Sequence, residues 1–266
     1  MNVLLLLAAI LFILMTLIGG KKGVRSFLAL FFNIGIILCT IIFLLSPSNN
    51  PIIITFVACT IISCINLFFI NGINKKTISA YISTMITIVI LFFFIFIVTE
   101  KSMIYGFGEE EIEELSMFSF YVGIDFVKIM VSLIIMTTIG AITDTAIAVA
   151  SPMYELHHHH PLISRKDLFG FGLRIGRDIL GTSTNTIFFA FFGGYLALFI
   201  WFIDLSYSLG EIVNSKIFSA EMITIFCAGI GITLIIPITS WITAYALVNM
   251  KTSIKTTDEN TGKEVI

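Results

Sequence analysis

Two neighbouring stretches hold most of the polar chemistry of this chain. Residues 140–152 read Gly-Ala-Ile-Thr-Asp-Thr-Ala-Ile-Ala-Val-Ala-Ser-Pro, and residues 176–186 read Gly-Arg-Asp-Ile-Leu-Gly-Thr-Ser-Thr-Asn-Thr. The first stretch places an ionisable residue, Asp144, inside an apolar run. A carboxylate in hydrocarbon costs about 2.5 to 3.5 kcal/mol, so such a residue normally faces a partner or a water-filled path. Asp144 is therefore the leading functional candidate.

The composition is that of an integral membrane protein. Of the 266 residues, 58% are hydrophobic and only 12% are charged, which is too apolar for a water-soluble globular protein of this length. The net charge of -2 and the position of the basic residues beside apolar runs disfavour nucleic-acid binding. The four cysteines lie in apolar runs without metal-ligand spacing, which favours small buried side chains over disulfides or metal thiolates.

Seven segments are apolar and about long enough to span a bilayer as helices. They are residues 2–19, 27–45, 52–70, 79–98, 127–150, 179–202 and 222–248. The runs lack the alternation of a lipid-facing barrel, so the sequence predicts an all-α polytopic membrane protein. We expect one transmembrane domain over residues 1–250, with the first helix additional to a core of six, and a disordered cytoplasmic tail over residues 251–266.

The basic residues predict an orientation. Twelve of the fifteen Lys and Arg residues fall in alternate connections and in the tail, and cytoplasmic connections are the ones enriched in Lys and Arg. This pattern places the N-terminus outside and the C-terminus inside. The twelve residues are Lys21, Lys22, Arg25, Lys75, Lys76, Arg165, Lys166, Arg174, Arg177, Lys251, Lys255 and Lys263.

Two further charged features flank the fifth predicted helix. The acidic run Glu109–Glu114 is expected to be a solvated exterior loop, and a mouth that gathers cations is the alternative. Asp125 and Lys128 are three residues apart at the helix start, so they can pair on one helix face.

The face of the fifth predicted helix around Asp144 carries small and hydroxyl-bearing residues, which favours a helix interface or a path over lipid contact. The next predicted helix begins with a basic residue and a belt of polar side chains, and we expect Asp144 to face that belt. Polar contacts that only hold helices together are the alternative. The candidates for a proton or ion path are Asp144, Thr143, Arg177, Asp178, Thr182, Thr184 and Asn185.

A run of histidines lies in the connection between these two helices. Imidazole groups bind transition metals, but consecutive side chains point in different directions and do not by themselves form a shaped site. The run therefore supplies only weak metal candidates, and no cofactor is expected. These candidates are Glu155, His157, His158, His159 and His160.

The stretches 140–155 and 175–194 resemble the signature of the YibE/F family, and the chain is similar to its short, YibF-like form without an exported domain. The resemblance covers most of the chain. It implies a multi-pass protein of the bacterial cytoplasmic membrane and little about chemistry.

A more distant resemblance is to SecF, an accessory protein of the protein translocon. It rests on the helix-borne Asp144, residues 177–184 (Arg-Asp-Ile-Leu-Gly-Thr-Ser-Thr) and a closing Gly193-Gly194. It implies a six-helix unit of the RND type with a proton relay, in which Asp144 is the carboxylate, Arg177 its cationic partner, and Thr182 and Thr184 the hydroxyl positions.

Two departures from SecF are visible. The exported domain expected between the first two SecF-like helices shrinks to residues 46–51, and the first helix is extra. One such unit does not make the paired arrangement, so the resemblance implies a second copy of the chain or a longer YibE-like subunit as partner.

The sequence favours a subunit of a proton-coupled or ion-coupled membrane transport or export complex. A non-catalytic assembly or sensor subunit is the alternative. An enzyme is disfavoured, because the sequence carries neither a nucleophile and base pair nor two metal-ligand motifs on adjacent helices.

Overall fold

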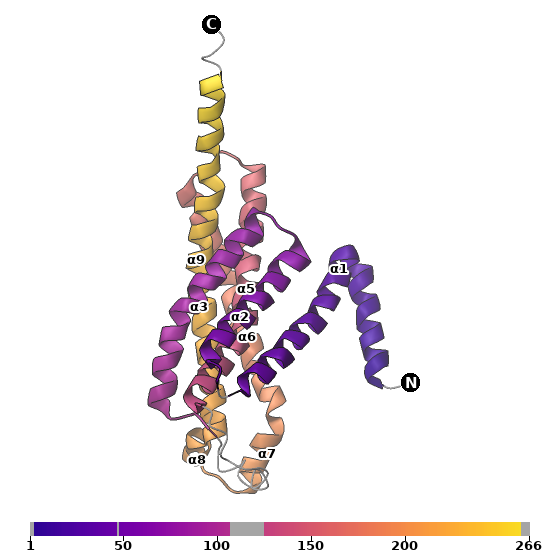
Figure 1. The fold of residues 1–266 in the computed structure, drawn as a ribbon, viewed down its shortest axis with the longest axis vertical. Helices are drawn as coiled ribbons and strands as arrows, with labels where there is room; N and C mark the ends of the chain where they lie inside the picture. Colours follow the sequence, from indigo (N-terminus) through magenta and orange to yellow (C-terminus); the bar gives the residue numbers. More distant parts are fainter. Residues whose placement is uncertain (1–2, 47, 107–124, 262–266) are drawn as a thin grey trace.

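The computed structural model describes residues 3–46, 48–106 and 125–261, and all regular structure in these ranges is helical (Figure 1). The all-α prediction is confirmed for this part of the chain. The helices are α1 (Val3–Leu44), α2 (Pro51–Cys64), the π-helix η1 (Ile65–Phe69), α3 (Lys75–Ser102), α5 (Phe126–His159), α6 (Arg165–Gly194), α7 (Leu196–Asp204), α8 (Leu209–Asn214) and α9 (Lys216–Thr261).

Helices α3, α5 and α9 form the centre of the bundle, and α6 packs along α9. Leu91 and Ile95 of α3, Ile142 of α5 and Ile235 of α9 are fully buried there. Lipid tails are as apolar as these side chains, so helix association in a membrane depends on close packing and on hydrogen bonds. The same three helices also bury many hydroxyl groups, among them Ser79, Ser83, Thr84, Thr87, Ser132, Thr138, Thr143, Thr145, Thr239, Ser240 and Thr243.

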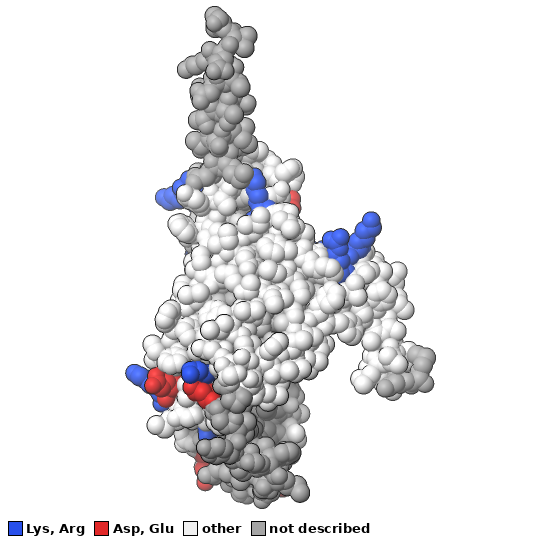
Figure 2. All heavy atoms as spheres, viewed as in Figure 1, with Lys and Arg blue, Asp and Glu red and all other residues white. Residues whose placement is uncertain are grey.

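The surface of the bundle fits a lipid environment. Five of the described helices are long and apolar enough to cross a membrane, or six if α6 and α7, which meet at a bend of 52°, form one span. Large apolar side chains such as Phe93, Phe226 and Trp241 are exposed. In Figure 2 the charged side chains lie at two levels, separated by a band of uncharged surface. The chain is therefore a membrane protein.

Helix α1 contains the first two predicted segments, residues 2–19 and 27–45, as one element with a break inside it. Gly20 has φ 54° and ψ -135° at the break, a conformation that glycine adopts without steric cost. The chain doubles back at this point (Figure 1). The described helices thus give five or six candidate spans in place of the predicted seven, because α1 is one element.

The two arms of α1 touch near the break. Gly23 is buried there, and a Cβ atom on it would lie 1.8 Å from the carbonyl oxygen of Met15. The rings of Phe12 and Phe27 lie 5.0 Å apart across the two arms. Only glycine at position 23 allows this close approach.

Helix α6 begins at Arg165, well before the predicted start at residue 179. The hydroxyl of Ser164 accepts a hydrogen bond from the backbone N–H of Asp167 at 3.1 Å and caps the helix. The prediction of a polar loop up to residue 178 was wrong. Its basic side chains occupy the outer face of a helix whose inner face is apolar and small, as in an amphipathic helix.

Glycines let α6 approach its neighbours. A Cβ atom on Gly172 would lie 2.5 Å from the sulfur of Met153 in α5, and one on Gly176 would lie 2.1 Å from Cγ2 of Ile236 in α9. Both glycines are buried. These two glycines, which lie before the predicted start of the helix, therefore allow α6 to pack closely against α5 and α9.

Other predicted boundaries also differ. The segment predicted over 179–202 is interrupted at Tyr195, where α6 ends and α7 follows. Helix α9 continues to Thr261, so most of the tail predicted to be disordered is helical. The acidic run Glu109–Glu114 and residues 262–266 lie outside the described residues.

The predicted pair of Asp125 and Lys128 is confirmed at the start of α5. The Lys128 ammonium lies 2.9 Å from Asp125 Oδ2, and the Asp125 carboxylate accepts a hydrogen bond from the Lys128 backbone N–H at 3.2 Å. The hydrogen bond to Lys128 lowers the pKa of Asp125. Exposed ion pairs contribute at most about 1 kcal/mol, so the main role of Asp125 is to cap the first turn of α5.

Candidate functional site

Asp144 lines a cavity between α1, η1 and α5. The cavity has a volume of about 330 Å³. Six of its lining residues are polar: Ser26 and Asn33 from α1, Asn66 from η1, Asn71 from the turn that follows, and Thr143 and Asp144 from α5. Asp144 is the charged residue of this described lining, so a single carboxyl group shares the cavity wall with amides and hydroxyls.

Helical spacing and the π-helix bring these side chains together. Asp144 and Ile147 are three apart on α5 and share a face, with Thr143 beside them. The π-helix η1 carries Asn66, and such single-turn π segments recur at functional sites. The Asn33 amide donates to Asn66 Oδ1 at 2.8 Å, and the Asn71 amide donates to the Asn66 carbonyl oxygen at 3.1 Å.

Two buried polar atoms beside Asp144 have no hydrogen-bond partner among the described residues. They are Asn33 Oδ1 and Thr143 Oγ1. Buried polar atoms are normally paired, and each exception calls for an explanation. Thr145, two residues further on, shows the usual solution for a helical threonine, because its hydroxyl donates to the Ala141 carbonyl oxygen at 2.8 Å.

The side chain of Asp144 lines the cavity and is exposed, while the neighbouring Thr143 is fully buried. No hydrogen bond or ion pair is found between Asp144 and another residue of the described ranges. An ionised carboxylate at membrane depth is costly without a counter-charge or water. The arrangement can therefore hold a proton, a cation or a polar group of another subunit.

No hydrogen bond or ion pair joins the polar residues of α6 to Asp144 within the described ranges. Arg177, Asp178, Thr182 and Asn185 are exposed on α6, and Thr182 donates to the Ile179 carbonyl oxygen of its own helix at 2.9 Å. Thr186 likewise donates to the Thr182 carbonyl oxygen at 2.8 Å. Hydroxyls that bond to their own backbone need no neighbouring helix.

Thr184 faces a different neighbour, since its methyl group would lie 3.7 Å from a Cβ atom on Gly229 of α9. Asp144 lines a cavity shared with α1 and η1. The roles predicted for Arg177, Thr182 and Asn185 remain predictions.

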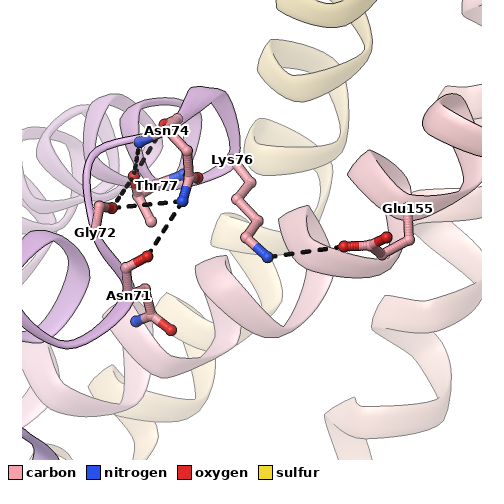
Figure 3. Close-up of polar contacts among 6 residues, drawn as sticks. All are labelled: Asn71, Gly72, Asn74, Lys76, Thr77 and Glu155. Atoms are coloured by element: carbon pink, nitrogen blue, oxygen red, sulfur yellow. Dashed lines mark hydrogen bonds and ion pairs between the residues drawn. The ribbon is translucent and has the colours of Figure 1, made fainter. Parts of the chain in front are cut away.

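The histidine run ends α5. His157, His158 and His159 form its last turn, and His160 caps it. Glu155 lies 3.9 Å from the Lys76 ammonium (Figure 3). Within the described residues, no group of three or more His, Cys, Asp or Glu side chains is placed to hold a metal ion.

The Lys76 and Glu155 pair ties the start of α3 to the end of α5. The turn before Lys76 is held by a capping box, in which the Asn74 side chain accepts from the Thr77 N–H and the Thr77 hydroxyl accepts from the Asn74 N–H, each at 3.0 Å (Figure 3).

Comparison with known families matches residues 7–249 to the model described as "YibE/F-like protein". The chain belongs to the YibE/F family. No curated protein and no solved structure matches it. The resemblance to SecF therefore remains a prediction.

The sequence reasoning missed the α1 and η1 side of the site in this YibE/F-like chain. Asn33 and Asn66 are amides inside the apolar segments 27–45 and 52–70. The argument that singled out Asp144, a polar group within an apolar run, also applies to them. Their pairing at 2.8 Å depends on the fold, because they lie in different helices.

Proposed function

We propose that this YibE/F-like chain is a subunit of a proton-coupled or ion-coupled membrane transport or export complex, and that Asp144 is the group that takes up and releases the ion. The observation that carries the proposal is a single carboxyl group in the wall of a cavity whose other polar lining residues carry amides and hydroxyls. Ionisable residues inside membrane segments typically mark ion paths.

The proposal includes an orientation. The chain has seven membrane segments, counting the two arms of α1 separately, with the N-terminus outside and the C-terminus inside a bacterial cytoplasmic membrane. The distribution of the Lys and Arg residues supports it. In Figure 2, basic side chains without acidic neighbours lie at the turn of α1, and mixed charges lie at the opposite end of the bundle.

The complex contains a second membrane subunit, either another copy of this chain or a longer YibE-like protein. Support comes from α6, where Arg177, Asp178, Thr182 and Asn185 are exposed. Polar side chains at membrane depth are stabilised by a neighbouring protein surface. The resemblance to SecF and to RND-type units agrees with such a pairing, and it assigns Arg177, Thr182 and Thr184 to the same path.

The test is complementation of a deletion strain, under a condition in which the deletion has a phenotype, by Asp144→Asn. The amide keeps the size and hydrogen bonding of the side chain and removes its titration. We expect the variant to reach wild-type amounts in the membrane and to lose at least nine-tenths of the activity. Asp204→Asn, at the end of α7, is the matched control and should complement fully.

The second candidate is a non-catalytic assembly or sensor subunit, in which Asp144 only contacts another helix. The exposure of Asp144 on the outer side of α5 favours this reading. An amide can replace a carboxyl group in such a contact, at an energy of about 1 to 2 kcal/mol. Full complementation by Asp144→Asn would therefore reject the transport proposal and favour assembly. Neither candidate involves a catalysed reaction.

A further inference from the structure

We propose that the cavity between α1, η1 and α5 binds one monovalent metal cation, Na⁺ or K⁺, through oxygen atoms of Asp144, Thr143 and Asn33. The inference rests on the proposed function in one respect, the assignment of Asp144 as the ion-exchanging group. It goes further by naming the class of ion and the residues that select it.

The donor atoms are those that hard cations prefer. Na⁺, K⁺, Mg²⁺ and Ca²⁺ are bound by carboxylate, amide and hydroxyl oxygens, whereas transition metals favour imidazole and thiolate ligands. The cavity is lined by no histidine or cysteine. Its polar lining contains only carboxyl, amide and hydroxyl groups, so it matches a hard cation and lacks the imidazole and thiolate groups that zinc and copper favour.

The orientation of Asn33 leaves an oxygen for a cation. Its amide nitrogen is engaged by Asn66 Oδ1 at 2.8 Å, and its own Oδ1 is buried without a partner. A buried acceptor without a donor destabilises the folded state. A bound cation satisfies that oxygen, which a hydrogen-bond acceptor in the same place would not.

Thr143 contributes a second oxygen of the same kind. Its side chain is fully buried, it lines the cavity, and its hydroxyl has no partner among the described residues. Thr137 and Thr145 on the same helix donate to backbone carbonyl oxygens at 2.9 and 2.8 Å. Of these three threonines, Thr143 is the one whose hydroxyl has no hydrogen-bond partner among the described residues.

The charge balance selects a monovalent ion. Asp144 supplies one negative charge and the remaining lining residues are neutral. One positive charge is neutralised at this site, whereas a divalent ion would leave an excess charge where Coulomb energies are large and poorly screened.

The cavity also has room for a partly hydrated ion. Its 330 Å³ compares with about 30 Å³ for a water molecule in the liquid. Ser26, Asn66 and Asn71 add further polar groups to the wall. The same wall includes Met15, before the break in α1, and Ser26, after it, so the doubled-back shape of α1 is part of the site.

The test is isothermal titration calorimetry on the full-length chain in nanodiscs, in choline chloride at constant ionic strength. We expect saturable binding of NaCl or KCl, and binding of either supports the proposal. Binding of neither, or tighter binding of MgCl₂ or CaCl₂, would overturn it.

Single-residue variants test whether the cation binds in this cavity. Asp144→Asn should abolish it, and Thr143→Val, which keeps the shape and removes the hydroxyl, should weaken it at least tenfold. Thr145→Val and Asp204→Asn are the matched controls and should stay within twofold of wild type. An equal loss of cation affinity in Thr143→Val and Thr145→Val would contradict the assignment of Thr143 as a ligand, because it would indicate a general effect on α5.

The two proposals fail separately. If Asp144→Asn loses complementation while the wild type binds neither Na⁺ nor K⁺, the transport proposal stands with a proton as the ion and the cation site is rejected. If the wild type binds the cation and Asp144→Asn still complements fully, the site stands and the transport proposal is rejected.

Discussion

At the scale of single residues, the side chains around Asp144 differ in how their polar atoms are satisfied. The Thr145 hydroxyl is bonded within its own helix, whereas the Thr143 hydroxyl and Asn33 Oδ1 are not bonded to any described residue. The same residue type thus has a structural role at one position and lines the cavity two residues away. The two threonines differ in whether the hydroxyl has a hydrogen-bond partner. A buried polar group without a partner destabilises the fold, so such a group is rare in a structural position.

Two glycines of α6 allow a prediction at this scale. Gly176→Ala should destabilise the protein by about 1 to 3 kcal/mol through overpacking, because the new Cβ atom would meet Ile236 Cγ2 at 2.1 Å. Gly181→Ala on the same helix meets nothing within 4 Å, so it should be neutral or stabilising by up to about 1 kcal/mol. Thermal unfolding in detergent measures both. Equal melting temperatures for the two variants would contradict the close packing of α6 on α9.

At the scale of elements, α1 is the helix that the sequence described least well. Its two arms meet at Gly20, and the second arm supplies Ser26 and Asn33 to the cavity. The first helix, expected to be additional to the core, supplies Met15 to the same wall. The element predicted to be extra therefore helps to enclose the candidate site.

A cysteine cross-link tests the shape of α1. Residues 12 and 27 would be about 22 Å apart along a straight helix with a rise of 1.5 Å per residue, whereas the rings of Phe12 and Phe27 are 5.0 Å apart across the break. In a variant without the four native cysteines, Phe12→Cys combined with Phe27→Cys should form a disulfide within one chain under mild oxidation. Phe12→Cys combined with Phe31→Cys, one turn further along, should react more slowly. Failure of the first pair to react would contradict the doubled-back α1.

At the scale of the whole molecule, the face seen in Figure 2 carries its charged side chains at two levels with uncharged surface between them. The connection between α5 and α6 carries Leu162, which is 94% exposed, and Asn49 is exposed in the connection between α1 and α2. The proposed orientation puts these two residues on opposite sides of the membrane.

Labelling of single cysteines checks that orientation. In intact cells, a membrane-impermeant thiol reagent should modify Asn49→Cys and leave Leu162→Cys unmodified, and both should react once the membrane is opened. The positive-inside distribution of Lys and Arg is the physical reason. Modification of Leu162→Cys from outside intact cells would reverse the proposed orientation.

The sequence by itself determined the helical class, the membrane environment and the approximate place of most segments, and it singled out Asp144 as a candidate. These features depend on composition and on runs of apolar residues, which act locally along the chain. Only the tertiary structure decided that Asp144 shares a cavity with Asn33 and Asn66, that α6 begins at Arg165, and that α1 doubles back at Gly20. These three features depend on contacts between segments that are distant in sequence, or on the backbone conformation of a single residue. The hydrophobic pattern of one segment predicts neither the contacts nor that conformation.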